Sequence, residues 1–272
     1  MKSQTPRRST RTGRRTPWTP IFDSRKRKGD ILVGDTPAWS GYQATILADG
    51  PVFYMPLDEA SGNMQDISGN ANHAVITNCT RNAIGLAAGG SASFNGAQDV
   101  RLGSAPAVLN IEADGDFTYE LWFERADSNY FGGMFIKRQN GSPFSQVGIS
   151  CGTISGAGAE VPSKRLTFAW FDGTNRRTWT TDTDVVDGGR HHVLMGMTGG
   201  TTPFCIVDGA AVGLTLGYSL NSFPAANIAH PVYIGWNGSA STFVGELDEC
   251  AIYDYALTTT EAAAHIAAKE IP

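Results

Sequence analysis

The sequence predicts an all-β sandwich, and three observations support this fold class. The 272 residues include 32 glycines and only 17% charged residues, which suits a turn-rich fold because glycine adopts the positive φ angles of tight turns. From Thr45 onward, short alternating apolar runs are separated by Gly, Asn, Asp and Pro, a pattern typical of strands joined by turns. Only one long helix pattern is present, near the C-terminus. Sandwiches of roughly 200 to 250 residues are common as single domains, so we expect one domain with an extension.

Phe117–Glu124 has the clearest strand pattern. Successive side chains of a strand point to opposite faces, so Phe117, Tyr119, Leu121 and Phe123 share one face and the residues between them share the other. Similar short runs predict further strands at Leu166–Phe171, His192–Met197, Phe204–Val207, Val232–Trp236 and Leu247–Tyr253.

Two segments that are far apart in the sequence are interpreted as the two ends of this sandwich. Tyr42–Ala74 contains a short helical turn, an aromatic strand and a polar loop, whereas Phe243–Leu257 is an alternating strand that leads into a helix. The helix begins at Thr258, since Thr258 and Glu261 form a capping box before an alanine-rich run. Because alanine buries little surface, we expect this short C-terminal helix at the edge of the domain.

The N-terminal region differs in charge from the rest of the chain. Residues 1–38 contain ten Lys or Arg and three Asp or Glu, whereas residues 39–272 contain eleven and twenty-three, which gives net charges of +7 and −12. A stretch with so much like charge and so few apolar residues cannot offset its own ordering entropy. We therefore expect residues 1–41 to form an extended basic arm that becomes ordered on a partner, and residues 42–272 to form the sandwich.

The arm contains apolar side chains that would anchor it to a protein. Trp18, Ile21 and Phe22 lie between two basic blocks, and Pro17 and Pro20 favour an extended chain. Fully extended, 38 residues reach up to roughly 125 Å, enough to cross a neighbouring subunit. The predicted anchoring residues are Arg7, Arg8, Arg11, Arg14, Arg15, Trp18, Ile21, Phe22, Arg25, Lys26, Arg27 and Lys28. Phosphate could also attract these arginines, but the acidic body would repel nucleic acid, so we favour a protein partner.

The four cysteines do not have the spacing of a metal site. Cys79, Cys151, Cys205 and Cys250 include no CxxC pair and no zinc-like spacing with histidine. Buried thiols are the simpler interpretation. A disulfide between Cys79 and Cys250 is the alternative, because both lie near the two segments expected to meet. No run of about 18 apolar residues is present, so no membrane span is expected.

A set of short motifs occurs in a fixed order along roughly residues 42–268. These are Leu57-Asp58-Glu59, Asp66–Asn70, Ser91–Gly96, Phe117–Glu124, Arg190–Val193, Val207–Gly209 and Gly245–Glu249. The ordered set resembles the concanavalin A-like, laminin-G type jelly rolls. The opening segment Tyr42–Leu57, with its tyrosine, Leu-Ala-Asp-Gly-Pro turn and aromatic strand, is similar to such modules in minor tail proteins of long-tailed bacteriophages.

This resemblance implies a structural role in a bacteriophage virion. The expected protein is a minor tail or tail-tip subunit that is anchored by its arm, displays a lectin-like domain and adheres to glycan on the host surface. A head decoration protein and a glycan depolymerase are the alternatives. Other virion subunits would be its partners, and a homo-oligomer is expected because arms that bind a repeated lattice are presented in rings.

The family that the sequence resembles also includes glycanases, which use paired carboxylates. Retaining enzymes place two carboxyl groups about 5 to 5.5 Å apart, and related folds supply them as Glu-x-Asp-x-x-Glu on one strand. Here the row is Glu246-x-Asp248-x-x-Ala251, so the third acid is missing and we expect no enzyme of this type. His191 and His192 are adjacent on a strand and point to opposite faces, so they cannot share one site.

Two ligand sites are predicted. Oxygen donors gather at Asp66, Ser68, Asn70 and Asn72, and the expected fold brings Asp248 near them, which suits a structural calcium ion. The alternative is an Asx-turn loop that holds itself by hydrogen bonds. Sugars need aromatic faces and planar polar groups; the candidates for carbohydrate binding are Tyr130, Trp170, Arg176, Trp179, Trp236 and Asn237.

Overall fold

A computed structural model gives the fold. It describes residues 40–77, 79–96, 99–102, 106–112, 115–126, 131–139, 145–154, 160–221, 229–235 and 243–270. The arm predicted for residues 1–41 therefore lies outside the described residues, except for Ser40 and Gly41 at the start of the first helix. Its twelve anchoring residues stay a prediction.

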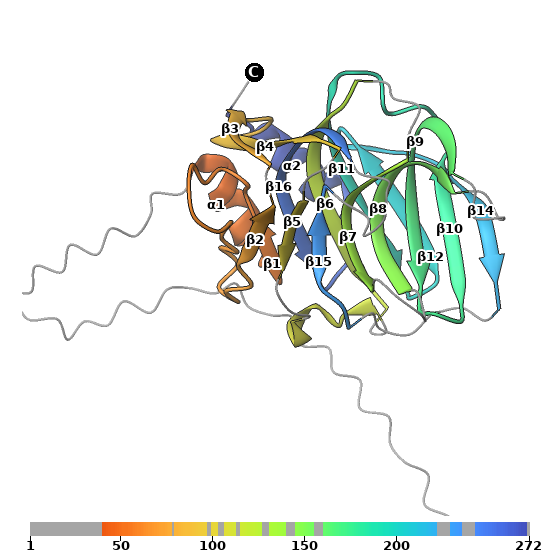
Figure 1. The fold of residues 1–272 in the computed structure, drawn as a ribbon. Coiled ribbons are helices and arrows are strands. Elements are labelled where there is room, and N and C mark those ends of the chain that lie inside the picture. The colour runs from red at the N-terminus through yellow and green to blue at the C-terminus, as the bar shows by residue number, and fades with distance from the viewer. Residues whose placement is uncertain are drawn as a thin grey trace, which may run out of the picture. The chain divides into compact units, whose positions relative to one another are not determined.

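The described chain forms two sheets of eight strands that lie against each other as a sandwich (Figure 1). Sheet A has the order β13-β12-β11-β6-β16-β4-β3, and β1 also pairs with β16. Its strands are β1 (Phe53–Met55), β3 (Thr80–Ile84), β4 (Gly90–Asn95), β6 (Phe117–Glu124), β11 (Arg190–Thr198), β12 (Thr202–Val207), β13 (Ala210–Ala211) and β16 (Val244–Tyr253).

Sheet B has the order β14-β10-β9-β8-β7-β15-β5-β2, and all its pairs are antiparallel. Its strands are β2 (Ala74–Thr77), β5 (Asp99–Leu102), β7 (Gly132–Gln139), β8 (Ser145–Ile154), β9 (Glu160–Phe171), β10 (Arg176–Thr181), β14 (Leu214–Leu220) and β15 (Val232–Ile234). The remaining elements are the helices α1 (Gly41–Ala48) and α2 (Thr259–Ala267) and the 3-10 turn η1 (Ala107–Leu109). The all-β sandwich predicted from the sequence is confirmed.

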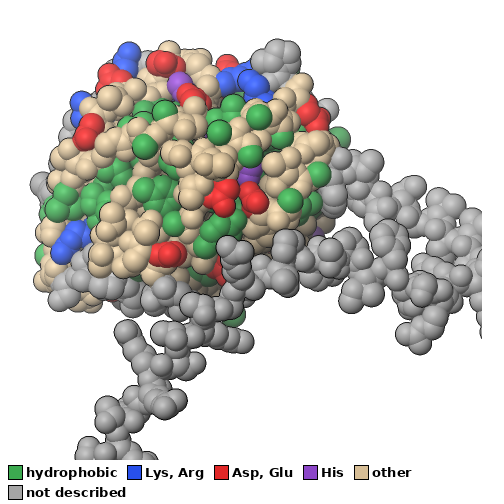
Figure 2. Space-filling model, turned by 180° about the vertical axis from the view of Figure 1, so that it is seen from behind, with side chains coloured by type: hydrophobic (Ala, Val, Ile, Leu, Met, Phe, Trp, Pro, Cys, Tyr) green, Lys and Arg blue, Asp and Glu red, His purple; other side chains and the backbone are tan. Residues whose placement is uncertain are grey.

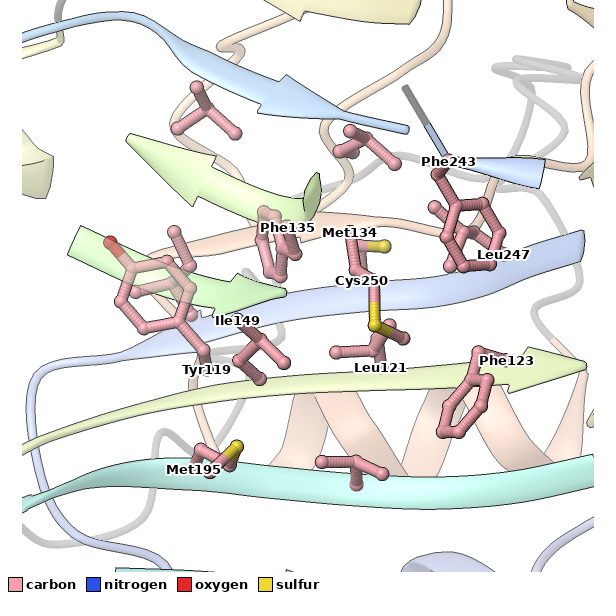
Figure 3. Close-up of a cluster of buried hydrophobic side chains, with 14 of the residues drawn as sticks. Tyr119, Leu121, Phe123, Met134, Phe135, Ile149, Met195, Phe243, Leu247 and Cys250 are labelled. Carbon is pink, nitrogen blue, oxygen red and sulfur yellow. The ribbon is translucent and has the colours of Figure 1, made fainter. Parts of the chain in front are cut away.

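The main core lies between the sheets. The inward face of β6 supplies Phe117, Tyr119, Leu121 and Phe123, which share one face as the alternation predicted and are fully buried. Figure 3 shows side chains from both sheets meeting in this layer, with Phe135 and Ile149 of sheet B against Tyr119 and Leu121 of sheet A. Tyr119 and Phe135 pack edge to face with their ring centroids 5.2 Å apart, a geometry that aromatic pairs favour.

The two ends of the domain meet in sheet A. Strand β1 pairs antiparallel with β16, with Phe53 opposite Ile252 and Met55 opposite Cys250. The segments Tyr42–Ala74 and Phe243–Leu257 therefore lie side by side, as the sequence predicted. All four cysteines are nevertheless buried thiols outside any disulfide, so that interpretation is confirmed and the disulfide alternative is not observed.

Both helices cover the outer face of sheet A. A second apolar cluster joins Tyr42 and Ile46 of α1 and Ala262 of α2 to the strand residues Trp122 and Tyr253. Helix α1 is a full eight-residue helix where only a short helical turn was expected. Its first amides, those of Gly41 and Tyr42, donate to the Glu270 carboxylate just beyond α2, which links the two ends of the domain.

Helix α2 begins as predicted, with Thr258 as N-cap and a reciprocal capping box to Glu261. Its predicted low burial is wrong for one turn, because Ala262 and His265 are completely buried against sheet A. No helix among the described residues is long and apolar enough to span a membrane. On the surface behind the view of Figure 1, Asp, Glu, Lys and Arg side chains are dispersed among uncharged ones and a hydrophobic patch (Figure 2).

Candidate functional site

The outer face of sheet B is the main candidate for a ligand site. In β9, Phe168 and Trp170 point into the core, so Thr167, Ala169 and Phe171 point outward. Strand register extends this assignment, because residues paired across two strands share a face. One row across the face is Arg138, Gln146, Phe171 and Arg176, and the next row is Ile136, Gly148, Ala169, Thr178 and Tyr218.

Small polar side chains occupy the centre of this face. Gln146, Ser150, Thr167 and Thr178 are each at most 2% exposed although they point away from the core. Gln146 Nε2, Ser150 Oγ and Thr178 Oγ1 have no hydrogen-bond partner in the part of the chain that the structure describes. A buried polar group without a partner costs about 1 to 3 kcal/mol, so such groups call for a specific explanation. One donor amide and two hydroxyls on one face are groups that can pair with sugar hydroxyls.

Aromatic side chains flank this polar centre. The guanidinium of Arg176 lies 4.9 Å from the centroid of the Tyr218 ring and 5.8 Å from that of Phe171. On the opposite side, Arg101 lies 5.0 Å from the centroid of Tyr233. Partial burial lowers the pKa of Arg176, but an arginine side chain stays charged in proteins. The face therefore combines planar rings, unpaired polar atoms and positive charge.

The predicted carbohydrate-binding residues are only partly brought together here. Arg176 lies on the outer face of sheet B. Trp170 is completely buried and Trp179 is 6% exposed, and both belong to the core between the sheets. Since a ring inside the core cannot stack on a sugar, the assignment of these two tryptophans is wrong. Tyr130, Trp236 and Asn237 lie outside the described residues.

Sequence reasoning also missed residues of this face. Gln146, Ser150 and Thr178 lie in short strand segments that match no known binding motif. The alternation of Leu166–Phe171 contained a usable signal, because it places Trp170 on the same face as Leu166 and Phe168. It could not say which face was buried until the partner sheet was known.

The loop predicted to bind calcium forms a dense hydrogen-bonded turn. Asp66 Oδ1 accepts from the amides of Tyr54 and Ser68, and Oδ2 accepts from the amide and the side chain of Asn72. The Asn70 side chain donates to Val52 O at 2.9 Å. Both lone pairs of each Asp66 oxygen are thus engaged, as the Asx-turn alternative expects. Calcium binding here stays a prediction.

Asp248 is engaged elsewhere. Its Oδ2 accepts from the amides of Leu86 and Ala87 at 2.8 and 3.2 Å, and burial raises its pKa well above the usual range. Glu246 lies opposite Glu124, and Ala251 lies opposite Glu120. The row Glu246-x-Asp248-x-x-Ala251 therefore lies on the side of sheet A that the helices cover, not on the outer face of sheet B.

A second polar cluster lies under the helices. Glu120 Oε1 is 2.6 Å from His192 Nε2 and 2.8 Å from His265 Nδ1, and Glu120 Oε2 accepts from the Tyr253 hydroxyl at 2.7 Å. His265 Nε2 is 2.9 Å from Asp49 Oδ2, so this imidazole bridges two carboxylates. The two histidines and Glu120 are completely buried. We call Glu120, His192, His265 and Asp49 the histidine clamp.

Charge pairing sets the protonation of the clamp. Burial alone would raise the pKa of Glu120, but the His265 charge and hydrogen bonds from both histidines outweigh it and lower the pKa to about 2. Burial disfavours the charged form of His265, yet the Glu120 charge and the bond to Asp49 raise its pKa to about 10. His265 is therefore an imidazolium that joins α2, β6 and the end of α1.

The clamp also has the donor types of a zinc site, since Glu120, His192 and His265 offer atoms within 4.8 Å of one another. Each of these three atoms already has a partner within the cluster, whereas His192 Nδ1 is buried without one among the described residues. His191, in contrast, lies on the other face of β11 beside Phe123, with Asp187 and Asp208 as partners. The prediction that His191 and His192 cannot share a site is confirmed.

Comparison with known proteins identifies the fold. A family model described as the concanavalin A-like lectin/glucanases superfamily matches residues 94–263. No curated protein sequence matches the chain. Domain 4 of AbnA, a GH43 extracellular arabinanase from Geobacillus stearothermophilus solved in complex with arabinotriose, superimposes with a TM-score of 0.56 at 16% identity, covering 79% of this chain and 98% of that domain.

The sialidase of Trypanosoma rangeli in complex with sialic acid superimposes with a TM-score of 0.57 at 13% identity, covering 80% of this chain and 33% of the sialidase. The chain thus spans about a third of the length of the sialidases it matches. At these identities the likeness is one of fold alone.

Proposed function

The chain belongs to the concanavalin A-like lectin/glucanase superfamily, and we propose that its sandwich binds a glycan through the outer face of sheet B. The observation that carries this proposal is the set of buried, unpartnered polar atoms on Gln146, Ser150 and Thr178 beside the rings of Phe171 and Tyr218. Sugar hydroxyls would pair with these atoms once side-chain movement uncovers them, because each is shielded from solvent in the unbound chain, and the rings would stack on sugar faces. The AbnA domain, solved with arabinotriose, supports the proposal, because the same fold there holds an oligosaccharide.

The strands of this face favour glycan binding over glycan hydrolysis. Strands β7, β8, β10, β14 and β15 contain no Asp or Glu. A pair of carboxyl groups that flanks a glycosidic bond is the usual requirement for hydrolysis. Strand β9 contains a single acid, Glu160, so the strands of the proposed binding face supply one carboxyl group and not a pair. The row that ends at Ala251 lies on the other sheet. The depolymerase alternative is therefore disfavoured.

Removing the unpartnered hydroxyls tests the binding face. We expect Ser150→Ala and Thr178→Val each to weaken glycan binding about tenfold, because one hydrogen bond to the ligand is lost. Neither change should reduce the free energy of unfolding, since each removes a buried polar group that has no partner among the described residues. Binding is measured on an array of microbial glycans, and stability by urea unfolding.

Thr118→Val is the matched control for this test. The Thr118 hydroxyl is also buried, but it donates to Tyr255 O at 2.8 Å and accepts from the Leu257 amide. This variant should lose stability and keep glycan binding. If Ser150→Ala and Thr178→Val lose stability while binding stays unchanged, the hydroxyls are structural and the proposed face is wrong.

We further propose that this domain is displayed on a bacteriophage virion, at the tail tip rather than the head. The resemblance of Tyr42–Leu57 to minor tail modules supports this location, and so does the basic segment at residues 1–38, which suits docking to acidic virion subunits. A tail-tip subunit would be present in a few copies per particle, whereas a head decoration protein would be present in hundreds. Ring-like presentation would make it a homo-oligomer in the particle.

Truncation tests the anchoring role of the arm. We expect a chain that lacks residues 2–38 to fold but to be absent from assembled particles, because the charges and apolar anchors that bind the virion are removed. Copy number is measured by quantitative mass spectrometry of purified particles, and full-length protein expressed in parallel is the control. Normal incorporation of the truncated chain would contradict the anchoring role.

A further inference from the structure

Positive charge is concentrated on sheet B, against the charge of the domain as a whole. Residues 39–272 contain eleven Lys or Arg and twenty-three Asp or Glu. Strand β9, between β8 and β10, contains Lys164, Arg165 and one acid, Glu160. Strands β7, β8, β10, β14 and β15 contain four cationic residues and no anionic ones. The cations are Lys137, Arg138, Arg176 and Arg177. An acidic domain that keeps acids off one set of strands presents a local surface attractive to anions.

Three of these four cations have structural partners. Lys137 forms a buried ion pair with Glu112 at 2.6 Å. Arg177 donates to the carbonyl oxygens of Leu220 and Asn221 at the end of β14. Arg138 donates to Gln146 Oε1 at 3.3 Å, which orients that amide on the outer face.

Arg176 differs from the other three. Among the described residues, its guanidinium contacts only the rings of Tyr218 and Phe171, and none of them accepts a hydrogen bond from it or pairs with its charge. Ring contacts on a guanidinium fix its plane and leave its N–H groups in that plane available. Such a planar fork pairs with two oxygens of a carboxylate or a phosphate.

Arg138 and Arg176 lie in the same row of the outer face. Between them stand Gln146 and Phe171, so the two arginines are three strand spacings apart, or about 14 Å between Cα atoms at ~4.8 Å per spacing. A ligand that reaches Arg176 along this row would therefore cross Phe171 and the unpartnered Gln146 Nε2. This arrangement suits an extended polymer better than a single sugar.

We propose that the ligand of this face is an acidic glycan and that Arg176 is the residue that binds its oxyanion. The inference rests on the proposed glycan-binding function and specifies the ligand class. A carboxylate or phosphate of the polymer pairs with the Arg176 guanidinium, while a neighbouring sugar lies over Phe171 and donates or accepts at Gln146. The acidic remainder of the domain repels the polymer elsewhere and so directs it to sheet B.

The test uses the full-length chain and three polymer probes. The first is a polyuronate, the second is the same polymer after chemical reduction of its carboxylates to alcohols, and the third is a poly(glycerol phosphate). The polyuronate and its reduced form differ only in the carboxylate. The poly(glycerol phosphate) shows whether a phosphate can replace that carboxylate. The microbial glycan array described above reports whether any polysaccharide is bound at all.

We expect an oxyanion probe to bind at least tenfold more tightly than the reduced polymer, with affinity that falls as salt rises. Arg176→Gln should remove this preference, and Arg176→Lys should restore only part of it, because lysine keeps the charge but not the fork. Arg165→Gln is the matched control: this exposed arginine of β9 already pairs with Asp184 at 3.4 Å, so its loss should leave binding unchanged.

The possible results separate the two claims. Binding to neutral array members, with equal affinity for the polyuronate and its reduced form or with no effect of Arg176→Gln, would overturn the acidic-glycan inference and leave glycan binding standing. Absence of binding to every array member and every probe would overturn the proposed function and this inference together. A preference that Arg165→Gln removes as fully as Arg176→Gln would show a general charge effect and would also overturn the role of Arg176.

Discussion

Glu120→Gln is expected to destabilise the domain by about 3 to 5 kcal/mol, the usual cost of removing one partner from a buried ion pair. The change keeps the volume of the side chain but removes the charge that faces His265 and weakens the bond to His192. The His265 imidazolium would then be buried with Asp49 as its remaining carboxylate. Urea unfolding of the full-length chain, followed by tryptophan fluorescence, measures the difference.

Glu124→Gln is the matched control on the same strand. Glu124 pairs with Arg190 at 3.0 Å, but both side chains are substantially exposed, and exposed pairs contribute about 0 to 1 kcal/mol. We expect this variant to unfold within about 1 kcal/mol of the native chain. If both glutamate variants have the same small effect, the histidine clamp does not hold the helices on sheet A.

The second large effect is a pH dependence that His265 confers on stability. The folded pKa of His265 is raised to about 10, above the value of about 6.5 for an unfolded histidine. The stabilisation is therefore fully present below about pH 6.5 and is lost as the pH rises through about 10. For Glu120 the folded pKa of about 2 is below the unfolded value, so its contribution is present above about pH 4.5 and is lost as the pH falls toward 2.

Other groups also titrate in alkali, so the measurement is a difference between two chains. We expect the free energy of unfolding of the native chain to exceed that of His265→Gln by several kcal/mol at neutral pH. The gap should narrow steadily as the pH rises from about 7 to about 10. A gap that stays constant over this interval would mean that His265 is not charged in the folded protein.

Local patterns were sufficient to predict the strands and the C-terminal helix. The alternation of Phe117–Glu124 predicted the strand and which residues share a face, and the Thr258-Glu261 capping box predicted where α2 begins. These predictions hold because strand alternation and helix capping depend on residues close together in the chain. The spacing of the four cysteines argued only against a metal cluster, and the choice between buried thiols and a Cys79–Cys250 disulfide needed the structure.

The binding face and the clamp could be predicted only in part. Arg176 was a candidate from the sequence, but Trp170 and Trp179 were assigned to the ligand although they fill the core. An aromatic residue in a strand has the same local pattern whether its face meets a partner sheet or a ligand. The clamp was missed altogether, since Glu120, His192 and His265 come from three elements far apart in the sequence.

Composition and local patterns were enough to predict the fold class, the family, the strand alternation and the division of charge between an N-terminal basic segment and an acidic remainder, because each depends on neighbouring residues or on composition. Which side of each sheet is covered depends on the packing of the folded chain. Packing α1 and α2 on sheet A buried the glutamate of β6 with two histidines and left sheet B with an outward polar face. A residue is buried only when other segments pack against it, and those segments are far away in the sequence until the chain has folded.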